Sequence, residues 1–186
     1  MSPGIVLALA SHMRSLLLLT AAVSLAACTG PTGHVTGPGE SVYTSDVRKL
    51  VVENRGGGLL PPPPSGAACD PQPAAYTLTV ASHQFDWQYC EVTGSGSTAT
   101  YTPRTGSRAL QAAEWSALQP ALAALIVSDR VDCGADKPEF ALTVTTSAGD
   151  LEYGDDFYAC QDRSRPYIVS DALGGALAAL RMLAHP

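Results

Sequence analysis

Residues 140–145, Phe-Ala-Leu-Thr-Val-Thr, alternate apolar and small or polar side chains without a break. This period of two is typical of a strand with one buried face. Residues 147–150, Ser-Ala-Gly-Asp, favour a turn. The chain can then return through residues 151–153 and 157–160, with Gly154 at a bulge. The pattern predicts an antiparallel hairpin.

A similar unit occurs earlier in the chain. Cys69 precedes Leu-Thr-Val at residues 78–80 by the same spacing as Cys133 precedes Leu-Thr-Val at 142–144. Residues 77–81 and 85–92 form the corresponding predicted strands. Each unit then runs into a helix rich in Ala and Leu, so the sequence suggests a ββα unit used twice.

Two helices are predicted from leucine spacing. The first begins after Leu110 and buries Leu118, Leu122 and Leu125, while Pro120 is expected to kink or split it. The second begins near Ser170 and Asp171, a favourable cap and first-turn acid, and is expected to bury Leu173, Leu177, Leu180 and Ala184. The predicted fold is α+β, an antiparallel sheet with two helices packed on one face.

The globular α+β domain is expected to span residues 47–186. Residues 48–54 have β-branched character and run into glycines, which predicts a strand followed by a turn. Four prolines at 61–64 exclude a helix there. Residues 98–102 predict a further short strand. Residues 28–46 are rich in Gly, Pro, Thr and Ser, so we predict a flexible tether.

The N-terminal residues 1–27 have the features of a secretory signal. Arg14 supplies a positive charge, and a short apolar run follows it. Leu25-Ala26-Ala27-Cys28 resembles the lipobox of bacterial lipoproteins, which implies cleavage before Cys28 and its lipidation. An ordinary signal peptide or an uncleaved membrane helix is the alternative, although the run is short for about 30 Å of hydrocarbon. Met13 is the favoured start of translation.

Export would leave 159 residues, because 186 minus 27 is 159. Only Arg14 is lost among the charged residues, so 10 basic and 17 acidic side chains remain. The sequence has no basic stripe of the kind that would predict nucleic-acid binding. Thr29 stands where lipoproteins retained at the inner membrane of enteric bacteria carry aspartate. The expected location is therefore the cell envelope, with the outer membrane favoured.

Four cysteines follow Cys28, and an even number in an exported chain predicts disulfides. The favoured pairs are Cys69–Cys90 and Cys133–Cys160, each within one predicted unit. Bridging between the units is the alternative.

The sequence contains no familiar catalytic motif, and we predict neither a metal nor a cofactor. The alternative is an enzyme with an unrecognised site near His83 or the acidic residues Asp150, Glu152, Asp155 and Asp156. A surface histidine and a solvated acidic edge explain these residues more simply.

Several short patterns occur in a characteristic order. They are Asn54-Arg55-Gly56-Gly57, Glu114 leading a helix, Asp136 before the strand 140–144, Asp155-Asp156, and the leucine-rich helix 173–183. This order is similar to the emfourin family, small protein inhibitors of thermolysin-like (M4) metalloproteases. The block 69–90, the proline run and the four cysteines depart from that family.

The resemblance implies a protein-binding module without catalytic activity. Arg55, Gly56 and Gly57 are the candidate partner-binding residues, and a secreted protease is the candidate partner. The hypothesis from sequence is therefore a membrane-anchored envelope lipoprotein that binds a protein. A purely structural envelope component is a further alternative.

Overall fold

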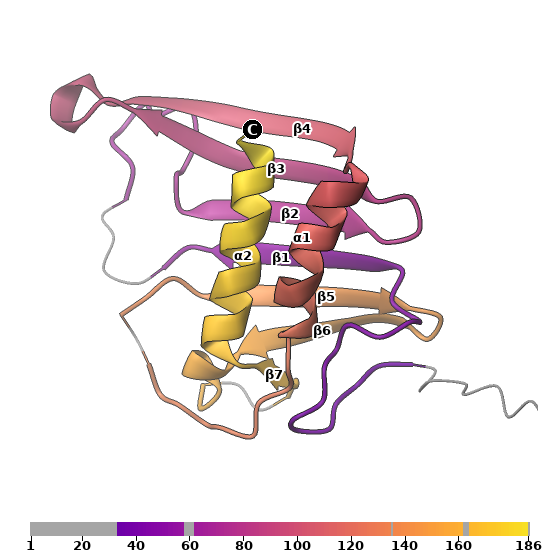
Figure 1. Cartoon of the computed structure of the whole chain (residues 1–186). Helices are drawn as coiled ribbons and strands as arrows, with labels where there is room; N and C mark the ends of the chain where they lie inside the picture. Colours follow the sequence, from indigo (N-terminus) through magenta and orange to yellow (C-terminus); the bar gives the residue numbers. More distant parts are fainter. Residues whose placement is uncertain (1–32, 58–61, 135, 162–163, 186) are drawn as a thin grey trace, which may run out of the picture.

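The computed structural model describes residues 33–57, 62–134, 136–161 and 164–185. The predicted signal and Cys28 lie outside these residues. The described chain forms a seven-stranded sheet with two α-helices across one face (Figure 1). The strands are β1 (Lys49–Arg55), β2 (Pro73–Thr79), β3 (Gln84–Thr93), β4 (Thr100–Ala109), β5 (Phe140–Thr146), β6 (Gly149–Asp155) and β7 (Tyr167–Ile168). The helices are α1 (Ala112–Ala123) and α2 (Ser170–Ala184), with 3-10 turns η1 (Gly96–Thr98) and η2 (Asp156–Tyr158).

The strand order is β4-β3-β2-β1-β5-β6-β7, so β1 lies at the centre. Every pairing is antiparallel except β6 with β7. The predicted α+β class and the position of both helices on one face are confirmed.

The two predicted ββα units lie on opposite sides of β1, and each has a third strand before its helix, β4 in the first and β7 in the second. Strands β2 and β5 both pair antiparallel with β1, so they run in the same direction. Their hairpin partners β3 and β6 extend away from β1 in opposite directions, while both helices cover the same face. The units therefore share an order of elements but have opposite hand, and no rotation superimposes them.

The core lies between the sheet and the helices. Alternate residues of β1, β2, β3, β5 and β6 point into it, as the period of two requires. Its fully buried side chains include Leu50, Val52, Tyr76, Leu78, Phe85, Leu118, Leu122, Leu125, Leu142, Val144, Tyr153, Leu173 and Leu180. The predicted stripe on α1 is confirmed, but α2 buries Ala176 fully and Leu177 partly. Helix α1 continues through Pro120 and ends one turn later, so Pro120 does not split it. The alternative, a kink at Pro120, stays a prediction.

The returning arm of the second hairpin differs from the prediction. Strand β6 is continuous through Gly154, which pairs in register with Ala141 and shows no bulge. A Cβ at Gly154 would lie 2.6 Å from the Tyr167 ring, so close packing is the reason for the glycine there. Residues 157–160 form no strand, because the chain turns at η2. Strand β4 begins two residues later than the predicted 98–102, after η1, and continues to Ala109.

The segment 33–46 packs on the domain, which corrects the predicted tether and the predicted domain start at Val47. Val35 and Val42 are buried in the core. The backbone of this segment bonds to the chain after α1, through Gly39 N to Val127 O at 2.8 Å and Val42 N to Leu125 O at 2.9 Å. Two valines spaced among Gly, Pro and Thr were too weak a signal to predict this contact.

Tyr153→Phe should loosen this segment. The buried Tyr153 hydroxyl donates to Val35 O at 2.7 Å, and burial raises the pKa of Tyr153 to about 12. Loss of the hydroxyl leaves a buried carbonyl without that donor, which costs about 1–2 kcal/mol of unfolding free energy. Urea denaturation and amide exchange of residues 35–42 measure the effect. Unchanged exchange there would contradict the packing described here.

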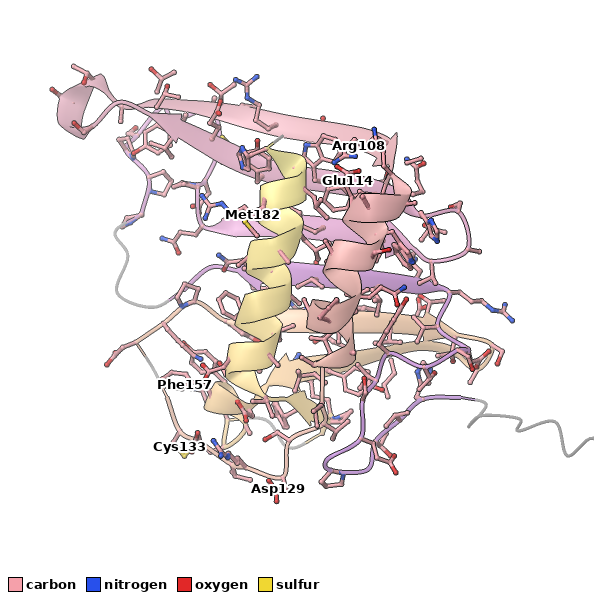
Figure 2. The ribbon with its side chains drawn as sticks, in the orientation of Figure 1. Arg108, Glu114, Asp129, Cys133, Phe157 and Met182 are labelled. Atoms are coloured by element: carbon pink, nitrogen blue, oxygen red, sulfur yellow. A yellow bond between two sulfur atoms is a disulfide. The ribbon has the colours of Figure 1, made fainter. Side chains whose placement is uncertain are left out.

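Arg108 on β4 links the edge of the sheet to both helices (Figure 2). Its guanidinium donates to both Glu114 carboxylate oxygens, at 2.7 and 2.8 Å, and to Leu183 O at 3.1 Å. Glu114 also accepts from Gln111 N at 2.9 Å and so caps the start of α1. These hydrogen bonds, chiefly those from Arg108, lower the pKa of Glu114 to about 2.

Glu114 should make stability depend on pH in acid. A carboxyl with a lowered folded-state pKa stabilises the fold above its unfolded pKa of 4.5, and this contribution is lost as pH falls through about 2. Glu114→Gln should therefore flatten the stability profile between those pH values. Thermal melts across this range test it, with Asp171→Asn as the control at the exposed start of α2. Identical profiles for the Glu114→Gln and parent proteins would contradict the assignment.

Candidate functional site

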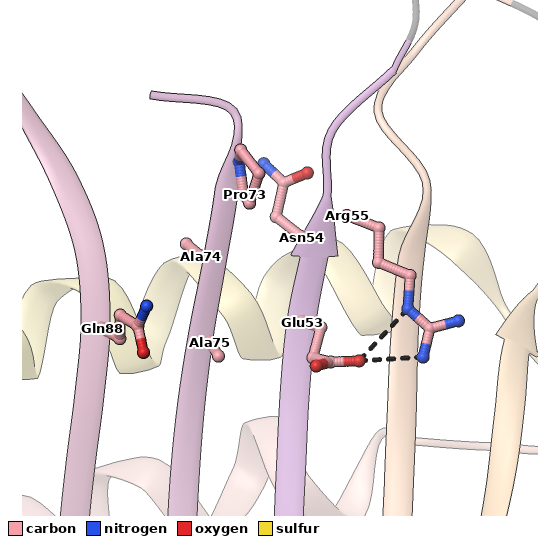
Figure 3. Close-up of a pocket in the computed structure, with 7 residues that line it drawn as sticks. All are labelled: Glu53, Asn54, Arg55, Pro73, Ala74, Ala75 and Gln88. Atoms are coloured by element: carbon pink, nitrogen blue, oxygen red, sulfur yellow. Dashed lines mark hydrogen bonds and ion pairs between the residues drawn. The ribbon is translucent and has the colours of Figure 1, made fainter. Parts of the chain in front are cut away.

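The candidate site lies where β1 ends, on the sheet face that the helices leave open. An open pocket of about 400 Å³ lies at this end. Figure 3 shows the residues that line it. Its lining residues are Glu53, Asn54, Arg55, Pro73, Ala74, Ala75 and Gln88. Glu53, Ala75 and Gln88 are direct neighbours across β1, β2 and β3, so the strand register builds the floor of the pocket.

An ionic network borders this pocket. Arg55 makes two parallel hydrogen bonds of 2.9 Å to the Glu152 carboxylate on β6 and two more, at 2.9 and 3.2 Å, to Glu53. Arg165 bonds to Glu139 at 3.0 Å and also to Glu152. Three carboxylates and two guanidinium groups thus meet on one surface, which we call the Arg55 network (Glu53, Arg55, Glu139, Glu152 and Arg165).

The network defines what Arg55 can offer a partner. Four of the five guanidinium N–H groups donate to Glu53 and Glu152. The hydrogen bonds that Arg55 donates to Glu152 raise the pKa of Arg55 above its ordinary value and lower the pKa of Glu152. The Glu53 and Glu152 side chains stay 32% and 38% exposed. The surface therefore presents carboxylate oxygens more than arginine donors.

Gly56 and Gly57 have structural reasons to be glycine. Both have positive φ, +77° and +91°, a backbone region that other residues rarely adopt. Gly56 is buried, and a Cβ there would lie 3.0 Å from Gln72. Gly57 is exposed and donates its N–H to Gln72 Oε1 at 2.9 Å. Of the three predicted binding residues, Arg55 and Gly57 are accessible at this surface.

A second surface lies between the helices. Ala117, Leu118, Ala179, Met182, Leu183 and Glu114 line a groove of about 150 Å³. Met182, labelled in Figure 2, is 70% exposed. This surface is mostly apolar, whereas the Arg55 network is ionic.

The structure does not bring together the residues of the enzyme hypothesis. His83, in the turn between β2 and β3, has φ +51° and stacks on Trp115 with ring centroids 4.1 Å apart. Asp150 accepts from Thr145 Oγ1 on the open face, four strands from β3. Asp155 and Asp156 are 1% and 3% exposed, so the predicted solvated acidic edge is wrong for these two residues.

Asp156 and Asp155 instead hold the start of α2. Asp156 accepts from Ser170 N at 2.8 Å and from Ser128 Oγ at 2.7 Å. Asp155 Oδ2 lies 3.7 Å from Lys137 Nζ. Lys137 Nζ also donates to Ser170 Oγ and lies 4.1 Å from the centroid of the Phe157 ring.

A lysine next to a serine can activate the hydroxyl as a nucleophile. Such a lysine must first give up its proton. Lys137 instead contacts a carboxylate and a ring face, which are partners of an ammonium cation. The contact between Lys137 and Ser170 is therefore best explained as a structural one that holds the loop before β5 against the start of α2.

No group of three or more His, Cys, Asp or Glu side chains within the described residues could hold a metal ion. In the same part of the chain, no helix is both long and apolar enough to cross a membrane. No protein-family model, curated protein or solved structure matches this chain.

Both predicted disulfides are confirmed. Cys69 pairs with Cys90, with Cα atoms 5.8 Å apart, and Cys133 pairs with Cys160 at 5.2 Å. The first bridge ties the loop before β2 to β3. The second ties the loop before β5 to the segment after η2. Cys28 lies outside the described residues.

The sequence did not reveal that Glu139, Glu152 and Arg165 join Arg55 in one network. Glu53 and Arg55 share a face by period-two spacing, which is visible in the sequence. Glu139, Glu152 and Arg165 reach them through the β1–β5–β6 pairing. No local pattern specifies that strand order.

Proposed function

We propose that this chain is a lipid-anchored protein of the bacterial cell envelope whose oxidised domain binds another protein without catalysis. Two intrachain disulfides in the described domain carry the proposal, because structural disulfides are typical of exported proteins. Leu25-Ala26-Ala27-Cys28 ahead of that domain supplies the attachment point. The emfourin-like order of elements favours a secreted thermolysin-like metalloprotease as the partner, and the absence of aspartate at position 29 favours the outer membrane.

The Arg55 network and its pocket are the binding surface we favour. They combine partly exposed carboxylates, the exposed amide of Gln88 and a pocket whose floor is built by neighbouring strands. Most pre-organised interfaces move little on binding, so a surface built on strands suits a protein partner. Asp155 and Asp156 belong to the emfourin-like pattern, but their burial leaves them a structural role. Glu114 likewise caps α1 and binds Arg108 on β4, which lies three strands from β1.

Cys28→Ser tests the anchor. The parent protein should fractionate with membranes and carry fatty acids at its N-terminus, whereas the variant should appear in the soluble fraction, because the several acyl chains are lost. Thr29→Ser is the matched control and should stay in the membrane. Thr29→Asp should shift the protein toward the inner membrane if the enteric sorting rule applies. A parent N-terminus without fatty acids would defeat the anchor.

Inhibition assays test the partner. The purified mature protein should lower the activity of secreted thermolysin-like metalloproteases of the same bacterium in proportion to its concentration. Gln88→Arg places a long cation in the pocket at an exposed site and should weaken inhibition at least tenfold. Met182→Arg is the matched control in the inter-helix groove and should inhibit as the parent does.

Two results would overturn the partner proposal. The first is the absence of any binding to these proteases by calorimetry. The second is a loss of inhibition in Met182→Arg while Gln88→Arg stays active, which would move the contact to the helices.

A further inference from the structure

The described chain begins against the turn between β5 and β6. Gly33 N donates to Asp46 Oδ2 at 3.1 Å, and the same oxygen accepts from Ser147 Oγ at 2.6 Å and Ser147 N at 3.3 Å. A Cβ at Gly33 would lie 4.0 Å from the Cβ of Ala148. The Ser147 hydroxyl, as the largest cause, lowers the pKa of Asp46, in keeping with a carboxylate that accepts these bonds. Asp46 thus links Gly33, where the described chain begins, to the β5–β6 turn.

Gly33 and the segment that follows it are fixed to the domain. Val35 and Val42 are buried, Tyr153 bonds to Val35 O, and Ser41 forms a β-bridge with Ile126. A pull on Gly33 would therefore be transmitted to the whole domain.

The distance from this point to Cys28 is short. Five residue steps separate Cys28 from Gly33, because 33 minus 28 is 5. Whatever their conformation, five residues reach at most about 18 Å. Residues 33–186 number 154, since 186 minus 32 is 154, and a compact domain of this size has a radius of gyration of about 15 Å and a diameter of roughly 38 Å. The reach is thus about half the diameter of the domain.

We propose that the β5–β6 turn, with Asp46 and Ala148, is the surface of this protein that faces the bilayer. The inference rests on the proposed lipidation of Cys28. A tether shorter than the domain prevents rotation that would bring the opposite end to the lipid head groups. Nearby charges have both signs, Asp46 and Asp150 against Arg48 and Lys49, so the tether and not net charge sets the orientation.

The opposite end is the β3–β4 hairpin with η1 at its tip. Figure 1 places this tip at the corner of the molecule diagonally opposite the start of the described chain. Gln84 at the start of β3 is level with Lys49 on β1 and Thr145 on β5. The hairpin tip lies nine residues farther along β3, and β3 lies four strands from β6. These steps amount to a separation of roughly 35 Å. The Arg55 network, at the far end of β1 from Lys49, is then open to partners in the envelope.

Energy transfer to labelled lipids tests the orientation. The full mature lipoprotein is reconstituted in vesicles of phosphatidylethanolamine and phosphatidylglycerol, 3:1, that contain a rhodamine-labelled head group. A fluorophore is attached through p-acetylphenylalanine at Ala148 or at Ser97, both exposed, which leaves the cysteines untouched. Transfer from position 148 should be at least threefold more efficient than transfer from position 97.

A longer tether is the matched control. Inserting about thirty Gly/Ser residues between Gly30 and Pro31 lengthens the tether from Cys28 to Gly33 to about 35 residues, with a root-mean-square reach of roughly 33 Å. This reach is comparable to the domain diameter, so the difference between the two positions should largely disappear.

The outcomes separate this inference from the proposed function. A protein that fails to float with the vesicles would overturn the lipid anchor itself. Flotation with equal transfer from both positions would overturn the orientation alone. A difference that survives the insertion would also overturn it, because the tether would then not be its cause.

Discussion

Removal of either disulfide should lower the free energy of unfolding by about 3.5 kcal/mol, because closed loops of about 22 and 28 residues restrict the unfolded chain by this amount in the chain-entropy model. The sequence separations are 21 and 27 residues. Cys69→Ala with Cys90→Ala removes the first bridge, and Cys133→Ala with Cys160→Ala removes the second. Urea denaturation under oxidising conditions measures both losses.

Reduction supplies the control for this prediction. With excess reductant, the parent should lose most of its advantage over each double variant. The two losses should also be of similar size, since the loops differ little in length. A loss below about 1 kcal/mol for both double variants would contradict the structural role of the bridges and weaken the argument for an exported protein.

Asp156→Ala should lower the free energy of unfolding by about 3 kcal/mol, since hydrogen bonds to a charged group contribute about 1.5–3 kcal/mol and a helix cap about 1. The buried carboxylate accepts from Ser128 Oγ and from Ser170 N at the first turn of α2. The Val169 cap position makes no side-chain capping bond, so Asp156 supplies it from a distant part of the chain. Chemical denaturation and the amide exchange of the first turn of α2 are the measurements.

Two further substitutions make this result specific. Asp156→Asn keeps one acceptor oxygen and should fall between the parent and Asp156→Ala. Asp150→Ala removes an exposed carboxylate from the same strand region and should change stability by less than about 1 kcal/mol. Equal effects at positions 150 and 156 would contradict the capping role.

The candidate site shows how far local patterns reach. Arg55 and its glycines could be selected from the sequence as the end of a strand and a turn. Their geometry then showed that Arg55 is held by Glu53 and Glu152 and that Gly56 is buried. The Glu152 carboxylate that stays partly exposed beside it comes from β6, a strand that the sequence could not place two positions from β1 in the sheet.

The sequence by itself determined the α+β class and both helices, because period-two alternation and leucine spacing act within short stretches of chain. It favoured the two disulfide pairs but left bridging between the units open, and the structure decided the pairing. Only the tertiary structure decided the central place of β1, the opposite hand of the two units and the packing of residues 33–46. These features depend on pairings between segments such as 49–55 and 140–146, whose choice of neighbour is set by the whole core. A weakly apolar segment such as 33–46 gains its place only when a surface is present to bury Val35 and Val42.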